Sequence, residues 1–214
     1  MLFRDRAAAG RALAERLGAY VGDPRVRVLG LPRGGIPVAY EVASFLNAPL
    51  DVFVVRKLGV PGQEELAMGA IATGGVRVVN ADVLSALGLT ERDLERAAAV
   101  ELAELARRET AYRGDRPAPD LHDATVIVVD DGLATGSTMR AAVSAIRPQG
   151  PARIVVAVPV SARSTRDALA REVDEIVCLA TPEPFLAVGR FYEDFTQTSD
   201  AEVHDLLDRA ARRG

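Results

Sequence analysis

The chain has 214 residues, of which 49% are hydrophobic and 26% charged, with a formal net charge of −4. This composition is that of a globular protein long enough to bury a core without disulfides, and its acidic balance argues against a general nucleic-acid binder. The single cysteine excludes an internal disulfide, no apolar run approaches the ~18 residues of a membrane span, and no secretory leader is evident, so we expect a cytoplasmic protein with neither membrane nor nucleic acid as partner.

The first half of the chain alternates helical and β-type patterns. Ala9, Leu13 and Leu17 recur at helical spacing, which predicts a first helix over residues 5–20. The next predicted elements are a strand at 25–31, a helix at 36–46 with Val38, Val42 and Phe45 on one face, a strand at 50–55, a mobile loop at 59–63, and a hairpin of 68–73 with 76–80 around Gly74-Gly75.

The second half continues the alternation after a long helix. Thr90 and Asp93 resemble an N-terminal cap, which predicts a helix over residues 90–113. The elements expected after it are strands at 125–129, 153–158 and 175–179, helices up to 146, over 164–172 and over 200–212, and an irregular segment at 181–195. Strands that alternate with helices predict an α/β fold with a parallel sheet, helices on both faces and the hairpin outside the sheet.

Residues 126–138 carry the most informative pattern. An apolar strand ends in Asp130 and Asp131, and burying two carboxylates together is costly unless sugar hydroxyls or a divalent cation neutralise them. The small hydroxylated residues 135–138 then open a helix, whose N-terminus is a natural phosphate cradle. The alternative is an ordinary strand, turn and capped helix with solvated acids. No P-loop lysine follows the glycine at the required spacing.

This stretch resembles the type I phosphoribosyltransferases, whose hallmark is an apolar strand, two acids and a phosphate loop. The resemblance implies a Rossmann-like core and displacement of pyrophosphate from 5-phosphoribosyl diphosphate (PRPP) by a small nitrogenous base or another nucleophile, with Mg²⁺. It gives the ribose hydroxyls and the metal, held directly or through water, to Asp130 and Asp131. The 5-phosphate loop it implies comprises Ala134, Thr135, Gly136, Ser137 and Thr138. Because Ala134 replaces an aspartate of the hypoxanthine-guanine branch, the loop is more similar to the adenine-type branch.

Two further basic segments match the family's pyrophosphate site. Arg33, Gly34 and Gly35 follow the first core strand, where the resemblance implies a pyrophosphate loop with a cis peptide at Pro32-Arg33; the alternative is a tight turn. Arg56 and Lys57, the only lysine, are expected to face the crevice at the root of a mobile lid; the alternative is a solvated strand end. Asp130, Asp131, Arg33 and Lys57 are the expected catalytic residues.

The C-terminal third resembles the family only loosely. Residues 184–195 are similar to the hood that selects the base, with Phe185 as a stacking residue, although packing of the final helix explains these aromatics equally well. His122 and His204 match no metal motif, and Cys178 is expected to be an inert core thiol.

We therefore expect one domain over residues 1–214. Its core covers about 25–180, the lid about 57–75, the hood about 181–197 and the terminal helix 200–212. A homodimer is left open. The alternatives to an enzyme of nucleotide metabolism are a non-catalytic regulator that senses PRPP or a nucleotide, and a diphosphosugar hydrolase for which no water-activating base is evident.

Overall fold

The computed structural model describes residues 2–60 and 63–213. Its strands are β1 (Val26–Gly30), β2 (Leu50–Val52), β3 (Val55–Val60), β4 (Gln63–Ala72), β5 (Val76–Val79), β6 (Thr125–Val129), β7 (Arg153–Val160) and β8 (Glu175–Ala180). Its α-helices are α1 (Arg6–Arg16), α2 (Gly35–Leu46), α3 (Ala81–Leu87), α4 (Glu91–Arg113), α5 (Ser137–Ile146), α6 (Arg163–Leu169) and α7 (Asp200–Ala211), with short 3-10 turns between some of them.

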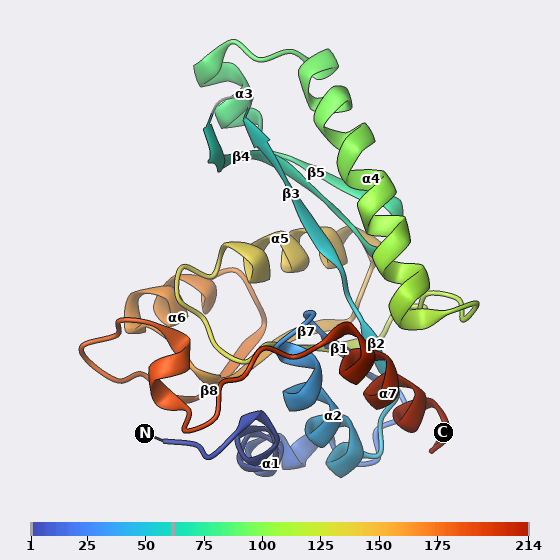
Figure 1. Cartoon of the computed structure of the whole chain (residues 1–214), viewed down its shortest axis with the longest axis vertical. Coiled ribbons are helices and arrows are strands. Elements are labelled where there is room, and N and C mark those ends of the chain that lie inside the picture. Colours follow the sequence, from blue (N-terminus) through green and yellow to red (C-terminus); the bar gives the residue numbers. More distant parts are fainter. Residues whose placement is uncertain (1, 61–62, 214) are drawn as a thin grey trace.

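The main sheet is parallel and has the order β2-β1-β6-β7-β8 (Figure 1). Alternate residues of each strand face opposite sides, so Ile127 and Val129 pack with α1 and α2, while Val126 and Val128 pack with α5. Both faces are therefore covered, which explains the continuous apolar runs of the strands. The predicted α/β fold with helices on both faces is confirmed.

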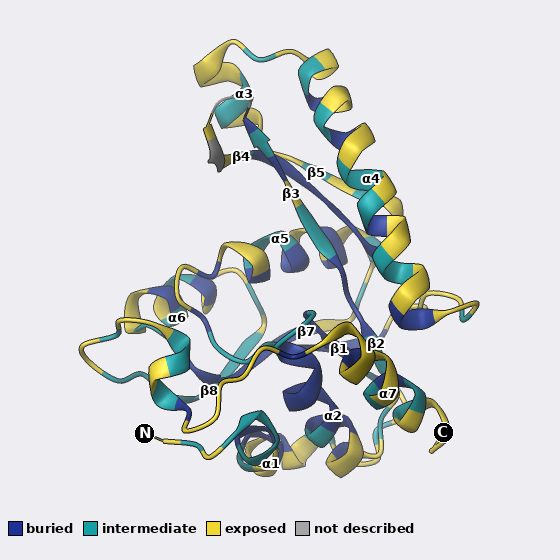
Figure 2. Cartoon of the chain, in the orientation of Figure 1, coloured by how far each residue is buried: buried dark blue, intermediate teal, exposed yellow. Residues whose placement is uncertain are grey.

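The second sheet is antiparallel and consists of β3, β4 and β5. Gly74, with φ of 80°, lies in the connection between β4 and β5, which confirms the predicted hairpin. The long helix α4 covers one face of this sheet through Leu94 and Ala98, and Thr90 and Asp93 form the expected capping box. Figure 2 shows α4 buried on the side that faces this sheet and exposed on the other. The segment from β3 to α4, which we call the arm, lies above the main sheet in this view.

Several predicted boundaries were wrong. The expected strand at 50–55 is two strands: β2 ends at Val52 in the main sheet, and β3 begins at Val55 in the second. The described residues of the expected loop at 59–63 are strand, because β3 continues to Val60 and β4 begins at Gln63. Helix α3 was not predicted, and the side chain of Phe45 is 48% exposed instead of facing the core.

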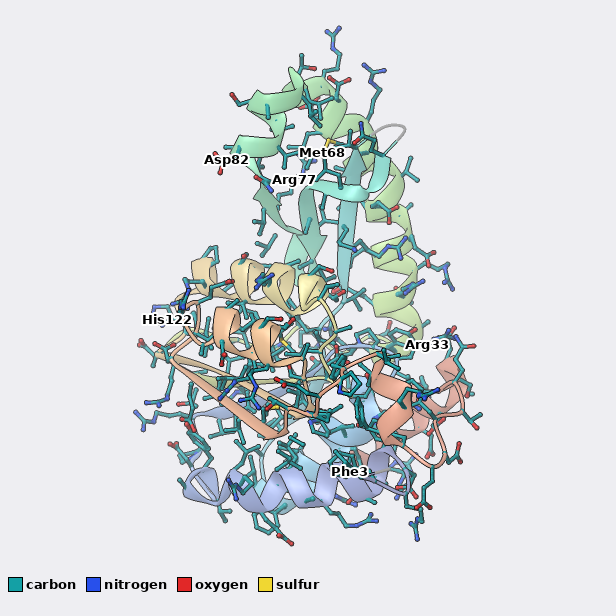
Figure 3. The ribbon with its side chains drawn as sticks, turned by 90° about the vertical axis from the view of Figure 1, so that its left-hand side faces the viewer. Phe3, Arg33, Met68, Arg77, Asp82 and His122 are labelled. Atoms are coloured by element: carbon teal, nitrogen blue, oxygen red, sulfur yellow. The ribbon has the colours of Figure 1, made fainter. Side chains whose placement is uncertain are left out.

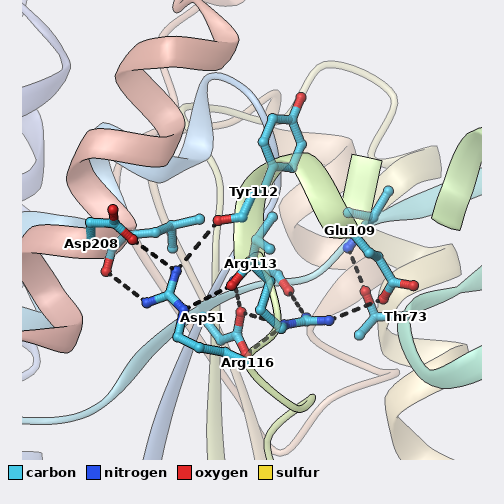
Figure 4. Close-up of polar contacts among 10 residues, drawn as sticks. Asp51, Thr73, Glu109, Tyr112, Arg113, Arg116 and Asp208 are labelled. Carbon is cyan, nitrogen blue, oxygen red and sulfur yellow. Dashed lines mark hydrogen bonds and ion pairs between the residues drawn. The ribbon is translucent and has the colours of Figure 1, made fainter. Parts of the chain in front are cut away.

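A buried ionic network fastens the base of the arm to the main sheet (Figure 4). Arg113 is only 7% exposed, and its Nε lies 3.1 Å from both carboxylate oxygens of Asp51 on β2. Arg113 also donates to the Val52 carbonyl at 3.0 Å and pairs with Glu109 at 3.3 Å. The last turn of α4 is thus bound to β2, the strand of the main sheet that precedes the arm. Across the described ranges, no helix is both long and apolar enough to cross a membrane.

Candidate functional site

The acid pair lies where the strand order of the main sheet reverses. From β1 the chain continues to β2 on one side, and from β6 it continues to β7 on the other, so α2 and α5 cover opposite faces. Such a reversal opens a crevice at the carboxyl ends of the two central strands, where ligands bind in this class of sheet. Asp130 and Asp131 directly follow β6 and so lie at this crevice. The predicted end of the strand at Val129 is confirmed.

Both carboxylates are in an environment that disfavours their charge. Burial raises the pKa of Asp130 well above its ordinary value, and the adjacent Asp131 charge raises it further. Burial also raises the pKa of Asp131, although the Arg6 guanidinium, whose Nε lies 2.8 Å from Asp131 Oδ2, opposes that shift. The pair therefore favours hydrogen-bond donors or a cation as ligands.

The turn after β1 packs directly on the acid pair. A Cβ atom added to Gly34 would overlap Asp131 Oδ2, and one added to Gly35 would lie 2.7 Å from the Val129 carbonyl and 3.0 Å from the Asp130 Cα. Only glycine allows this approach. The peptide bond between Pro32 and Arg33 is cis, as predicted.

The loop 134–138 presents an open helix N-terminus. Helix α5 begins at Ser137, as predicted, after Gly136, whose φ of 72° is left-handed. The N-cap residue offers no side chain and no acid lies in the first turn, while Thr135, Ser137 and Thr138 are exposed. Thr135 Oγ1 accepts only a long hydrogen bond of 3.5 Å from the Ser137 N–H. The loop is fixed from behind, because Thr165 donates its hydroxyl to the Ala134 carbonyl at 2.5 Å. The first amides of α5 are thus available for an anion.

The predicted basic residues lie in three different surroundings. Arg33 points to α7, where its Nη1 lies 3.8 Å from Asp200 Oδ1 (Figure 3). Arg56 pairs with Glu101 of α4 at 2.5 Å. Lys57 is exposed and, by strand alternation, shares the face of Val55, which packs against the core around α5. The prediction that Arg56 and Lys57 both face the crevice is therefore wrong for Arg56.

The predicted lid is a strand pair for most of its length. Pro61 and Gly62, at the expected tip of the lid, lie outside the described residues. Residues 55–60 and 63–72 belong to β3 and β4, so the fold carries Lys57 on a sheet.

The aromatic segment closes over the N-terminus of the chain instead of the final helix. Tyr192 pairs with Phe3 through a β-bridge and a 5.6 Å ring contact, and Phe185 stacks on Phe191 at 5.3 Å. This group packs on Ala9 of α1 and Val160 of β7. The same segment also contacts the acid turn, the turn that follows β6 and contains the acid pair and Gly132, because a Cβ on Gly132 would lie 2.6 Å from Val188.

Two residues near the acid pair were missed by sequence reasoning. Arg6 binds the Asp131 carboxylate, and the Tyr192 hydroxyl donates to the Asp131 carbonyl at 2.6 Å. Tyr192 belonged to a recognised aromatic run, but Arg6 is one of many arginines in the chain and is separated from Asp131 by 125 positions.

A separate hollow of about 570 Å³ lies between α2, β2 and α7. Asp51 and Arg116 contribute to its wall, but both are already paired, with Arg113 and Asp208 respectively. This hollow is at the amino end of β2, so it is distinct from the acid-pair crevice. Among the side chains that the structure describes, no three or more of His, Cys, Asp or Glu form a group that could hold a metal by themselves.

An acid pair at a strand-order reversal, next to an open helix N-terminus, is typical of α/β proteins that bind ligands at the carboxyl ends of their central strands. The chain belongs to the phosphoribosyl transferase domain family, whose profile matches residues 4–194. The match extends beyond the expected core of about residues 25–180, and takes in Arg6 and the aromatic segment.

Individual relatives agree with this assignment. Curated proteins from two strains of Mycobacterium tuberculosis, provisionally named phosphoribosyl transferases, are 51% identical over 211 residues. The match covers 99% of this chain and 47% of theirs, so the chain spans about half the length of these relatives. The crystal structure of the protein TT1426 from Thermus thermophilus is 43% identical, with a TM-score of 0.87 over 97% of this chain and 98% of that one.

Proposed function

We propose that this chain is a Mg²⁺-dependent phosphoribosyltransferase, which displaces pyrophosphate from PRPP with a nitrogenous base. One observation carries the proposal: the acid pair, the Gly34-Gly35 turn and the open end of α5 all adjoin one crevice. A PRPP molecule carries ribose hydroxyls, a pyrophosphate and a 5-phosphate, which match these three features in kind.

In this proposal each feature binds one part of the donor. Asp130 and Asp131 accept hydrogen bonds from the ribose hydroxyls, which stabilises carboxylates whose pKa values burial raises. The amides of residues 135–138 bind the 5-phosphate. The turn at Gly34 brings backbone close to the pyrophosphate, with charge from Arg33 and Lys57. Catalysis would then rest on positioning and charge stabilisation, since the protein forms no covalent bond.

Magnesium fits this donor set. Two adjacent carboxylates are hard oxygen ligands, but two are too few for a protein-only site, so donor oxygens and water would complete the coordination. When bound, the ion would neutralise charge on the departing pyrophosphate. To reach the pyrophosphate, Arg33 would need to leave Asp200. This 3.8 Å contact is easily broken, because the Arg33 side chain is 36% exposed.

Pyrophosphate release from PRPP with Mg²⁺, measured across purines, pyrimidines and small amines, tests the proposal. Asp130→Asn and Asp131→Asn should each lower turnover on the order of 10²-fold. Asp205→Asn, which changes an exposed aspartate of α7, is the matched control and should be neutral. Donor binding without release for every acceptor would favour the sensor. Unchanged donor binding in both acid-pair variants would reject the site.

A further inference from the structure

Arg6, the first residue of α1, connects three separate parts of the molecule. Its Nε donates to Asp131 Oδ2 at 2.8 Å, and its Nη1 donates to the Thr196 carbonyl at 2.8 Å. Its guanidinium carbon lies 3.9 Å from the centre of the Phe195 ring. The side chains of Arg6 and Asp131 are only 11% and 15% exposed, so this ion pair is largely shielded from water.

Each contact uses a different part of the guanidinium. One edge binds the carboxylate, a terminal nitrogen binds the backbone, and the flat face lies over an aromatic ring. Only arginine offers all three, because a lysine ammonium is a point charge without a planar face. Arg6 therefore does more than balance the charge of Asp131.

The segment that Arg6 holds is bound to the acid turn at a second point. The Tyr192 hydroxyl donates to the Asp131 carbonyl at 2.6 Å, and Tyr192 lies 5.1 Å from Phe195. Arg6 Nε would also lie 3.3 Å from a Cβ on Gly34, so the pyrophosphate turn meets the same point. Besides its backbone pairing with residues 2–4, the segment 191–196 is thus joined to Asp131 at two points, to the carboxylate through Arg6 and to the carbonyl through Tyr192.

We infer that Arg6 is a positioning residue for the transfer reaction. It holds the Asp131 carboxylate in place for the ribose and makes the placement of residues 191–196 depend on that carboxylate. This inference rests on the proposed function. A carboxylate accepts about four hydrogen bonds, so Arg6 and a ribose hydroxyl can bind Asp131 together. Donor binding and the order of the aromatic segment are then coupled through one side chain.

Arg6→Gln and Arg6→Lys separate the two roles. Arg6→Gln should weaken PRPP binding about 10- to 100-fold, the loss expected for one hydrogen bond between charged groups. It should also raise hydrogen exchange in residues 191–196 of the ligand-free protein. Arg6→Lys keeps the charge but not the flat face, so it should restore donor affinity to within several-fold while hydrogen exchange in residues 191–196 stays raised.

Arg11→Gln is the matched control. Arg11 lies on the same helix, pairs with Glu41 at 3.2 Å and is 54% exposed, so its loss should change neither measurement. Thermal unfolding checks that each variant folds. If Arg6→Gln does not fold, Arg6→Lys is used for the test.

The outcomes distinguish this inference from the proposed function. Unchanged exchange in both Arg6 variants overturns the coupling, whether or not the protein binds PRPP. Unchanged donor affinity in Arg6→Gln overturns the positioning role. If the wild-type protein binds no PRPP, the proposed function fails; raised exchange in Arg6→Gln would then support only the structural link, and the role in the reaction would be overturned with the function.

Discussion

Replacing Gly34 by alanine tests whether the turn after β1 and the acid pair form one site. Gly34 has φ of −62° and ψ of −29°, which alanine adopts without strain. The whole effect must therefore come from the added Cβ, which would overlap Asp131 Oδ2 and lie 2.7 Å from its Cγ. The carboxylate would have to shift, and its 2.8 Å contact with Arg6 would be distorted with it.

The expected magnitudes differ for stability and for binding. Overpacking costs about 1–3 kcal/mol, and the lower end applies here because a terminal carboxylate can move. That corresponds to a fall in Tm of about 2–4 °C for a chain of this size. Donor affinity should fall by more, about 10- to 100-fold, because a ribose hydroxyl loses a hydrogen bond to a charged group.

Calorimetric titration of PRPP with Mg²⁺, paired with thermal unfolding, measures both effects. Gly18→Ala is the control, because a Cβ there meets nothing within 4 Å. Wild-type donor affinity in Gly34→Ala would refute the argument that the turn and Asp131 contact the same ligand. A large loss of Tm in the control would show that glycine substitution itself is harmful.

Three further predictions concern the rest of the chain. Arg113→Met should lower the free energy of unfolding by about 3–5 kcal/mol, because it leaves the Asp51 carboxylate buried and unpaired. A loss below about 1 kcal/mol in chemical denaturation would contradict the stabilising role of the ionic network around Arg113. Burial and the charge of Asp200 raise the pKa of Tyr112 from 10.0 to about 12, so the neutral phenol stabilises the fold below pH 10 and this contribution disappears as the pH rises to 12. The free energy of unfolding of Tyr112→Phe should therefore fall less between pH 10 and pH 12 than that of the wild type, and an equal fall would reject the assignment. Lys57→Ala should reduce turnover more than donor affinity, since pyrophosphate gains charge mainly as it leaves. Arg56→Ala should reduce turnover little, because Arg56 faces α4. Equal losses of turnover in the two variants would show that the face of β3 on which a residue lies does not determine its role in turnover.

Elements with strong local signals were predictable from the sequence. Residues 125–129 form a continuous β-branched and apolar run, and Thr90 with Asp93 forms a capping box, so both the central strand and the start of α4 were predicted correctly. The family motif likewise indicated the cis peptide at Pro32-Arg33 and the start of α5. In each case the information lies within a few neighbouring residues.

Features that depend on partners distant in sequence became visible in the folded structure alone. The run at 50–55 has one apolar pattern, yet it divides between two sheets, because Leu50 to Val52 pair with β1 whereas Val55 pairs with Ala72 of β4. Arg56 and Lys57 are adjacent in sequence, but strand alternation and the position of α4 direct them to opposite faces. Arg6 meets Asp131 only because the N-terminal segment pairs with residues 191–194 beside the acid turn. Such contacts join segments that are distant in sequence and whose local patterns do not refer to each other, so no single window of sequence contains them.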